Sequence, residues 1–429
     1  MFFHHSTFVR RTFLISIVLA ALTLCVLICG CRWGVRPASP TPSPAVETPE
    51  PTPTPEPVDE VVAFVSSSFE EAFRDYSGLR GKITVSDLLK YTALDLSYCE
   101  LNDIRDVAMF KNLVFLDLSG NKISDISPLS ELTGLTELYL ETNCISDISP
   151  IEGLNGLVVL WLYDNSITDI SALKGFAELT ELPLHNNRIS DLTPLKELKG
   201  LEYISLNNNR IKDVSPLCGL DNLTELHLDN NALENIGVLS SLPSLKTLSL
   251  AKCKVSDVSM LAAFTKLDSL ALDNNYITDL TPLASLERLT VLSIMNNGFS
   301  DISALAKMNR LMRLSLYQNK ITDISPLKNL TRLEYLDIGN NQISDIAPLE
   351  KLTDLSVLSI MQNQIEDISV LVNLKYLNYL YINSNRISDA SVLFELTNLL
   401  ELCVSGNKIL KTTVDELRAA LPKCAFPNY

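Results

Sequence analysis

The sequence predicts an α/β protein built as a right-handed solenoid, in which short parallel strands form one continuous sheet and tight turns form the opposite side. Two observations support this prediction. From Leu94 to the end, the chain repeats every 22 residues without an insertion or deletion. A typical copy, residues 311–332, reads LMRLSLYQNKITDISPLKNLTR. Its apolar side chains cannot form a core alone, so neighbouring copies must stack to bury them.

The two halves of each copy have different apolar spacings. Leu314 and Leu316 are separated by one residue, which is the period of a strand, so both face the core. Their neighbours, among them Arg313 and Tyr317, face away from it. The next apolar residues are three apart, which predicts a return path of tight turns or 3₁₀ helix.

One position of the repeat holds asparagine, or cysteine in two copies. We expect its side chains to form a buried ladder that satisfies backbone groups at the turn after each strand. The fifteen positions are Cys99, Asn121, Asn143, Asn165, Asn187, Asn209, Asn231, Cys253, Asn275, Asn297, Asn319, Asn341, Asn363, Asn385 and Asn407.

A column of aspartates precedes the second half of most copies: Asp103, Asp125, Asp147, Asp169, Asp191, Asp213, Asp257, Asp279, Asp301, Asp323, Asp345, Asp367 and Asp389. It fits either a calcium ribbon or local hydrogen bonding to the turn backbone. Calcium needs six to eight oxygens, and each aspartate stands alone between apolar neighbours, which favours the local role. Serines that follow, as in Ser127-Pro128, Ser149-Pro150, Ser215-Pro216 and Ser325-Pro326, are expected to be helix N-caps.

The motif LxxLxLxxN in these copies resembles that of the leucine-rich repeat family. The longer motif N-x-I-x-D-I-x-P-L, with its 22-residue period, resembles the internalin-like class of bacterial surface proteins. For the repeats of residues 92–410, the resemblance implies a parallel sheet on the concave face, 3₁₀ or turn segments on the convex face, and helical caps. It also implies recognition or adhesion, without specifying a receptor.

Both ends of the repeats need caps, because an open end would expose the leucine core. Residues 59–91 are predicted to form a helical N-terminal cap, with short amphipathic helices near 67–77 and 85–91. Residues 411–429 are predicted to form the C-terminal cap, with one helix that is capped by Thr413 and ends before Pro422.

The first 30 residues have the pattern of an export signal: a short basic segment followed by an apolar run. The end of this run, Leu27-Ile28-Cys29-Gly30-Cys31, resembles the lipobox of bacterial lipoproteins. That resemblance implies cleavage before Cys31 and a lipid on its sulfur. An uncleaved transmembrane helix is the alternative. Residues 31–58 carry the modified cysteine and a linker rich in Pro, Thr and Glu, a semi-rigid spacer. Both alternatives place the repeats outside the cytoplasmic membrane.

The formal net charge of −16 restricts the partners of the chain. Phosphates of nucleic acids and of anionic membrane surfaces would be repelled, whereas cationic proteins or peptides fit. No catalytic signature or cofactor motif is present. His185 and His227, with nearby carboxylates, would be a weak candidate for zinc, because two repeats separate them. Among the cysteines, only Cys403 and Cys424 are placed to approach each other, and their pairing stays open.

The outward positions of the strands form the predicted concave face. Repeats three to seven carry the first cluster, made up of Glu137, Tyr139, Glu141, Trp161, Tyr163, Glu181, His185, Tyr203, Glu225 and His227. Repeats ten to fourteen carry the second cluster, which surrounds Arg313 with Met295, Tyr317, Tyr335, Met361, Tyr379 and Tyr381. Aromatic anchors near charges are typical of recognition surfaces. Cross-strand packing that only stiffens the sheet is the alternative.

The sequence therefore predicts a membrane-tethered, extracytoplasmic binding protein whose concave face recognises a basic protein or peptide. Carboxylates would steer the partner and aromatic side chains would anchor it. A structural envelope scaffold without a concave ligand and a glycan-binding module remain as alternatives. An enzyme is the least supported reading.

Overall fold

The structure is a computed structural model that describes residues 59–427. The predicted signal peptide, Cys31 and the linker up to residue 58 lie outside the described residues. Fifteen strands form one parallel sheet whose strand order follows the chain. They are β1 (Ala93–Asp95), β2 (Phe115–Asp117), β3 (Glu137–Tyr139), β4 (Val159–Trp161), β5 (Glu181–Pro183), β6 (Tyr203–Ser205), β7 (Glu225–His227), β8 (Thr247–Ser249), β9 (Ser269–Ala271), β10 (Val291–Ser293), β11 (Arg313–Ser315), β12 (Tyr335–Asp337), β13 (Val357–Ser359), β14 (Tyr379–Tyr381) and β15 (Glu401–Cys403).

The strands pair with residues one repeat apart, from Leu94 opposite Leu116 to Leu380 opposite Leu402. Between β4 and β5 only Val159 and Glu181 are paired. Pro183 lies in β5 and has no N–H to donate, which accounts for the shortened ladder. The constant repeat length thus keeps every strand in register, and one proline interrupts the ladder locally.

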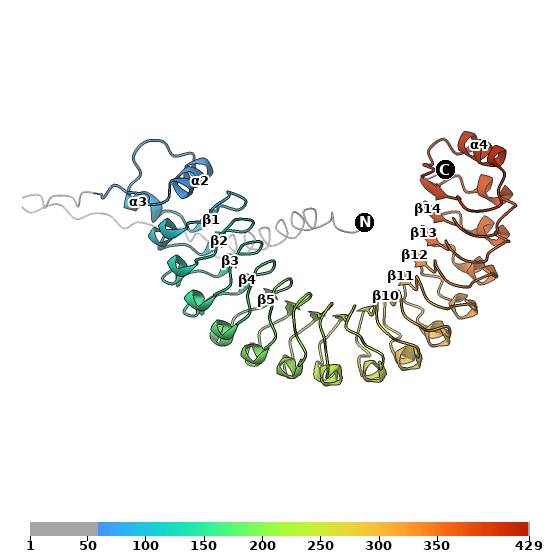
Figure 1. Ribbon diagram of the computed structural model, residues 1–429, viewed down its shortest axis with the longest axis horizontal. Helices are drawn as coiled ribbons and strands as arrows, with labels where there is room; N and C mark the ends of the chain where they lie inside the picture. The colour runs from blue at the N-terminus through green and yellow to red at the C-terminus, as the bar shows by residue number, and fades with distance from the viewer. Residues whose placement is uncertain (1–58, 428–429) are drawn as a thin grey trace, which may run out of the picture. The chain divides into compact units, whose positions relative to one another are not determined.

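A tight 3₁₀ turn follows each of the first fourteen strands, on the opposite side of the solenoid. In Figure 1 the strands line the inner side of a curve, and the turns line its outer side. The turns are η1 (Arg105–Met109), η2 (Ser127–Leu129), η3 (Ser149–Ile151), η4 (Ser171–Gly175), η5 (Thr193–Leu195), η6 (Ser215–Leu217), η7 (Ile236–Ser241), η8 (Ser259–Ala263), η9 (Thr281–Ser285), η10 (Ser303–Lys307), η11 (Ser325–Leu327), η12 (Ala347–Lys351), η13 (Ser369–Asn373) and η14 (Ser391–Glu395). The predicted fold class is confirmed.

The core lies between the sheet and the turns and runs the length of the repeats. In the copy at 311–332, Leu314, Leu316, Ile321 and Leu327 are all fully buried. Burying one such side chain stabilises the fold by roughly 1.5–3 kcal/mol. Since each copy contacts its neighbours, this stabilisation depends on an uninterrupted stack.

The asparagine ladder is confirmed. Asn187 donates from Nδ2 to the carbonyl oxygens of Leu162 and Leu184, at 3.0 and 3.1 Å, and its Oδ1 accepts from the N–H of Ile167 at 2.9 Å. Cys253 occupies the same position, and its Sγ donates to the carbonyl of Leu228 at 3.2 Å. Each amide therefore links backbone groups of two adjacent repeats in the buried interior.

The aspartate column makes the predicted local contacts, but the expected serine N-caps are wrong. Asp125 accepts a hydrogen bond from the N–H of Ser127 at 2.8 Å, and Ser127 is the first residue of η2 rather than its cap. The same contact joins Asp213 to Ser215 and Asp323 to the N–H of Ser325. The carboxylate two residues before the turn takes the capping role, which explains why aspartate recurs there.

Helices are present at both ends of the described chain, with two differences from the predicted bounds. At the N-terminal end α2 spans Ser67–Ser77, and α3 is shorter than expected, spanning Val85–Leu88. Buried Asp106 of the first repeat accepts from the N–H groups of Val65 and Ser66, both at 2.8 Å, and fixes the start of α2.

At the C-terminal end α4 spans Lys411–Ala420, so Thr413 lies inside the helix and the expected cap is wrong. The helix begins three residues earlier because Leu410 is extended and its carbonyl accepts from the N–H of Val414 at 3.2 Å.

Three further features concern residues 59–427. No helix there is long and apolar enough to cross a membrane. No group of three potential metal-ligating side chains occurs in that range. Cys403 and Cys424 are both free thiols, as are Cys99, Cys144, Cys218 and Cys253.

Candidate functional site

The candidate site is the inner face of the sheet. In β3 the middle residue, Leu138, is fully buried, and Glu137 and Tyr139 on either side of it are half-buried on the opposite surface. The same alternation recurs in β4 and β7, where Trp161 and Glu225 are half-buried. The short strands thus present two or three side chains per repeat on one continuous surface.

Aromatic side chains of the first cluster, together with Phe115 of β2, contact one another across four repeats. Ring centroids of Phe115 and Tyr139 are 5.4 Å apart, and those of Tyr139 and Trp161 are 5.1 Å apart with edge-to-face geometry. Trp161 lies 6.0 Å from Tyr163, and Tyr163 is stacked on His185 at 4.3 Å. This cross-strand packing stiffens the sheet, and the same half-buried rings remain partly open to solvent.

Glutamates of the face are each hydrogen-bonded to an aromatic side chain or an imidazole. Tyr139 donates from its hydroxyl to Glu137 at 3.0 Å, and His227 Nε2 lies 2.7 Å from Glu225 Oε1. The four pairs are Glu137 with Tyr139, Glu181 with Trp161, Glu225 with His227, and Glu401 with Tyr381. This pairing orients the carboxylates while leaving other lone pairs available.

Three of these glutamates lie in one column on alternate strands: Glu137 in β3, Glu181 in β5 and Glu225 in β7. Two strand spacings correspond to about 10 Å. Within residues 59–427, none of the three forms an ion pair with a lysine or arginine, and only His227 contacts one of them as a potential cation. The column is therefore an array of carboxylates without cationic side chains to neutralise it.

Burial changes the titration of several groups on this face. It raises the pKa of Glu181, an effect that the hydrogen bond from Trp161 opposes and that Glu137 reinforces. Burial also lowers the pKa of His185, so the neutral imidazole is favoured there, and raises the pKa of Tyr139. The first cluster is thus partly desolvated, which strengthens its electrostatic interactions relative to those of open surface.

Two aspartates of the face accept hydrogen bonds from the next repeat. Asp229 accepts from the Ser249 hydroxyl and from the N–H of Ala251, the latter at 2.7 Å. Asp273 accepts in the same way from the N–H of Met295 at 2.7 Å, and burial raises its pKa. These carboxylates satisfy backbone donors of the next repeat and contribute structure as well as charge.

Glu141 differs from the expectation of an exposed contact residue. It is 1 % exposed, and the hydroxyl of Tyr163 lies 3.5 Å from its Oε1. Glu141 therefore contacts Tyr163 inside the protein and does not present its carboxylate to solvent.

The second cluster has a different chemistry. The guanidinium of Arg313 lies over the ring of Tyr335, with its central carbon 4.7 Å from the ring centroid. The side chains of Tyr317 and Met361 both lie close to Gly339. A Cβ added at Gly339 would be 3.1 Å from Tyr317 and 3.0 Å from Met361. The result is an aromatic and thioether surface around one exposed cation.

The remaining predicted residues extend these two clusters. Tyr379 is exposed, Tyr381 pairs with Glu401, and Tyr203 packs against His227 at 5.9 Å. Strands β8 to β10 separate the clusters with small side chains, namely Thr247, Ser249, Ser269, Ala271, Val291 and Ser293. The structure therefore places the predicted residues on one face but in two separate groups.

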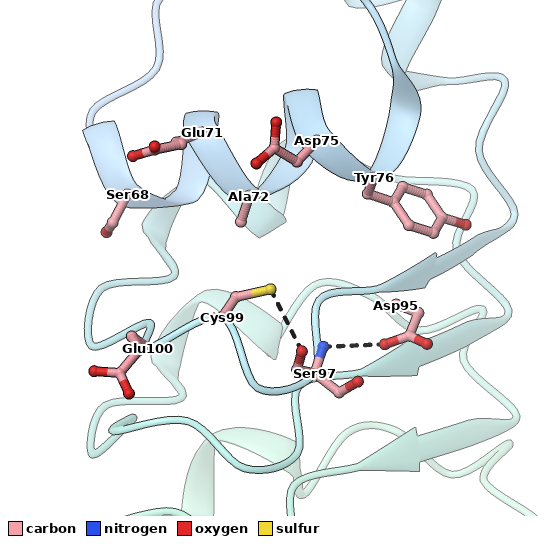
Figure 2. Close-up of a pocket in the computed structure, with 9 residues that line it drawn as sticks. All are labelled: Ser68, Glu71, Ala72, Asp75, Tyr76, Asp95, Ser97, Cys99 and Glu100. Atoms are coloured by element: carbon pink, nitrogen blue, oxygen red, sulfur yellow. Dashed lines mark hydrogen bonds between the residues drawn. The ribbon is translucent and has the colours of Figure 1, made fainter.

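An acidic pocket lies at the N-terminal end of this face. Its volume is about 590 Å³, and it is lined by α2 and the first repeat. Figure 2 shows Glu71 and Asp75 of α2 on one side, with Asp95 and Glu100 of the first repeat on the other. Negative charge thus continues from the first cluster to the cap.

Sequence reasoning missed a second amide ladder at the edge of the sheet. Asn208 donates to Asn186 at 2.6 Å, and Asn230 donates to Asn208 at 2.8 Å. These residues adopt positive φ values of 55–56°, which asparagine tolerates better than most residues. The doubled Asn-Asn at 186–187, 230–231 and 274–275 was the signal for this ladder.

Comparisons with known proteins agree with this architecture. The family model described as Leucine Rich repeats (2 copies) matches residues 90–131, 111–154, 155–197, 199–241, 243–285, 287–329, 310–351 and 331–373. No curated protein sequence matches significantly. Among solved structures, an internalin (inlF) from Listeria monocytogenes is 35% identical, covering 85% of this chain and 96% of its own, with a TM-score of 0.56.

Two further structures share the fold at lower identity. A leucine-rich repeat protein of Leptospira interrogans is 24% identical, with 80% and 97% of the two chains covered and a TM-score of 0.71. A plant peptide hormone receptor, RGFR1 in complex with RGF2, is 20% identical, with 81% and 67% covered and a TM-score of 0.62. The chain belongs to the leucine-rich repeat family and is an internalin-like member of it.

Proposed function

We propose that the chain is an extracytoplasmic recognition protein, tethered to a bacterial membrane through a lipid on Cys31, whose first cluster binds a basic protein or peptide. The observation that carries this proposal is the column of Glu137, Glu181 and Glu225. These carboxylates are oriented by Tyr, Trp and His donors and are not neutralised by lysine or arginine within residues 59–427. A cationic ligand supplies the missing countercharge.

The aromatic side chains provide an apolar surface on which such a ligand can pack. Trp161 and Tyr139 form an edge-to-face pair between Glu137 and Glu181. Lysine and arginine bury their aliphatic stems against rings of this kind, and their charges are attracted to the ring faces. The net charge of −16 adds long-range attraction for a cationic partner.

The family supports a recognition role in general terms. A solenoid of leucine-rich repeats is suited to binding proteins and peptides, and the plant receptor of the same fold was solved with RGF2 bound. Catalysis has no support from a recognisable residue set in the described part of the chain. Recognition by the sheet face is the function that the geometry supports best.

The spacing of the glutamates defines a probe. Three residues of a peptide in the extended polyproline II conformation rise about 9 Å and bring the side chain back to the same side, which is close to two strand spacings. A synthetic peptide with lysine at every third position and glycine between, amidated at its C-terminus, should bind the full chain with a strong dependence on salt. Fluorescence anisotropy of the labelled peptide measures its dissociation constant.

A triple variant, Glu137→Gln, Glu181→Gln and Glu225→Gln, tests the site directly. We expect binding to weaken about tenfold or more, since three partly exposed ion pairs contribute roughly 0.5 kcal/mol or more each. The control, Glu152→Gln, Glu178→Gln and Glu197→Gln, makes the same change of charge at exposed positions on or near the turns. Equal effects of both variants would show that binding depends on the net charge of the chain and not on the glutamate column.

Two other functions predict different results. A scaffold without a concave ligand predicts no difference between the triple variant and its control in any association with cell-envelope proteins. A glycan-binding module predicts salt-insensitive binding of a neutral oligosaccharide that depends on Trp161. Either result would contradict recognition of a basic ligand by the glutamate column.

Tethering is tested separately. We expect the chain expressed in bacteria to incorporate labelled fatty acid and to partition into the detergent phase. Cys31→Ser should abolish the incorporation of fatty acid and leave the apolar segment uncleaved, whereas Cys29→Ser should do neither, because only Cys31 follows the small residue at the predicted cleavage site. An unmodified chain that takes up no fatty acid, keeps its first 30 residues and still partitions into the detergent phase would favour the uncleaved transmembrane alternative.

A further inference from the structure

Arg313 is the one lysine or arginine among the outward strand positions of the repeats. It is exposed, and within residues 59–427 it makes no ion pair with a carboxylate. In a chain with 51 acidic residues and a net charge of −16, an exposed arginine without a carboxylate partner requires explanation. It lies in the same sheet as the glutamate column.

The guanidinium is held in place by an aromatic ring instead of by a charge. Arg313 and Tyr335 are direct neighbours in the register of β11 and β12, and the guanidinium carbon lies 4.7 Å from the ring centroid. Stacking on a ring fixes the plane of the guanidinium but leaves its N–H groups along the edge free to form two parallel hydrogen bonds. A group held in this way is pre-organised for a carboxylate.

The surroundings favour the same conclusion. Val291 and Val357 lie in the same column on either side of the Arg313–Tyr335 pair, and both are half-buried. The acidic residue of β12, Asp337, is half-buried and accepts from the N–H of Gly339 at 3.0 Å. An ion pair formed here would therefore have apolar neighbours and little competition from the protein.

We propose that Arg313, lying over Tyr335, forms a subsite that binds an anionic group. The ligand is then an extended bipolar peptide segment with basic residues at one end and a carboxylate at the other. This inference rests on the proposed function of the first cluster. It assigns the ligand a direction along the solenoid: the basic end lies over β3 to β7 and the carboxylate lies over β11 and β12.

The distance between the two sites sets the length of the ligand. Four strand spacings separate Glu225 in β7 from Arg313 in β11, which corresponds to about 19 Å, or roughly six residues of extended peptide. The intervening strands carry small side chains such as Ser249, Ala271 and Ser293. A peptide backbone can approach the sheet closely there, so one ligand can contact both clusters.

The test uses four labelled synthetic peptides and the full chain. The first carries three lysines spaced by two glycines. The second adds a Gly/Ser spacer of about six residues and a glutamate with an amidated end; the third replaces that glutamate by glutamine. The fourth ends in glutamine with a free carboxylate, which distinguishes an acidic side chain from a chain terminus as the source of the anion.

We expect the glutamate peptide to bind about five- to tenfold more tightly than the glutamine peptide, as one favourable Arg–carboxylate pair allows. Arg313→Gln should abolish this difference and leave the affinity of the lysine-only peptide unchanged or slightly higher. The control Arg310→Gln removes an equal charge from the exposed turn just before this repeat and should preserve the difference. Tyr335→Phe should also preserve it, whereas Tyr335→Leu should reduce it because the stacking ring is lost.

The outcomes separate this inference from the proposed function. Equal affinities of the glutamate and glutamine peptides for the unmodified chain, with normal binding of the lysine-only peptide, would overturn the subsite and leave the basic-ligand function intact. Failure of the lysine-only peptide to bind would overturn both. A gain from the free-carboxylate peptide alone would support the subsite and identify a chain terminus as its ligand group.

Discussion

The imidazole of His185 lies parallel to the phenol ring of Tyr163, with centroids 4.3 Å apart and planes 11° from parallel. The stack joins two neighbouring repeats at the end of the aromatic series of the first cluster. Burial lowers the pKa of His185, while the nearby Asp164 opposes that change and His227 adds to it. The neutral ring is thus the form that fits the folded chain.

This relationship predicts a contribution of His185 to acid sensitivity. A group whose pKa is lower in the folded chain contributes stability that is present above its unfolded value near 6.5 and is lost as the pH falls through the lowered pKa. His185→Phe keeps a stacking ring without a titrating group, so its melting temperature should fall less between pH 7 and about pH 5 than that of the unmodified chain, by about 1–2 °C. An identical pH profile for both proteins would show that His185 is not desolvated.

Trp161 provides an optical test of the first cluster. Its ring is half-buried against Tyr139, and its indole nitrogen lies away from solvent on the side of Glu181. In the full chain with Trp33→Phe, we expect an emission maximum shifted to the blue of free tryptophan. A cationic quencher should act more strongly than iodide, because carboxylates surround the ring. Glu181→Gln should reduce that preference, and stronger quenching by iodide would contradict an acidic face.

The asparagine ladder predicts large losses of stability. Asn187→Ala removes the donor to Leu162 and Leu184 and the acceptor for Ile167, which leaves backbone groups without partners in the interior. We expect the free energy of unfolding to fall by about 2–4 kcal/mol. Asn187→Cys, which copies the residue found at Cys253, should cost less because its thiol can still donate to a carbonyl. Urea denaturation of the three proteins gives the order, and an equal loss for both variants would mean that only side-chain volume matters.

The 22-residue period determines most of the fold, so the fold can be predicted from the sequence. Once Leu314 and Leu316 define a strand, the constant 22-residue spacing places every other strand and the asparagine ladder. The site is less predictable because it depends on rotamers and on neighbours one repeat away. Spacing alone does not reveal that Glu181 is bonded by Trp161 or that Arg313 stacks on Tyr335.

Two of the wrong predictions, the serine N-caps and the surface position of Glu141, also depend on neighbouring side chains. Serine before proline is a common N-cap pattern, but here Asp125 and its equivalents already cap the turn from two residues earlier. Glu141 is predicted on the surface because it is counted as an outward strand position. The hydroxyl of Tyr163 in the next repeat lies against its carboxylate, and Glu141 is buried instead.

The aspartate column predicts a second, more acidic transition. The backbone hydrogen bonds to Ser127 and Ser149 lower the pKa of Asp125 and Asp147 from 3.8, and several equivalents behave alike. A lowered carboxyl pKa contributes stability above the unfolded value, and this stability is lost as the pH falls through the lowered pKa. Thermal unfolding should therefore show a steep loss of stability below about pH 4. Replacing four column residues by asparagine, which still accepts the hydrogen bond, should flatten that loss, whereas alanine at the same sites should lower the melting temperature at pH 7.

The cysteines predict an order of chemical reactivity that also addresses the pairing left open by the sequence. Cys144 is exposed, whereas Cys253 is 1 % exposed and burial raises its pKa to about 11. Cys403 and Cys424 are free thiols at the C-terminal end, where burial raises the pKa of Cys424 to about 11 as well. Because the thiolate is the reactive form, iodoacetamide near pH 8 should modify Cys144 first and Cys253 last. Mass spectrometry of peptides from the non-reduced chain should find Cys403 and Cys424 unlinked, and a linked peptide would show that the end of the solenoid closes by a disulfide.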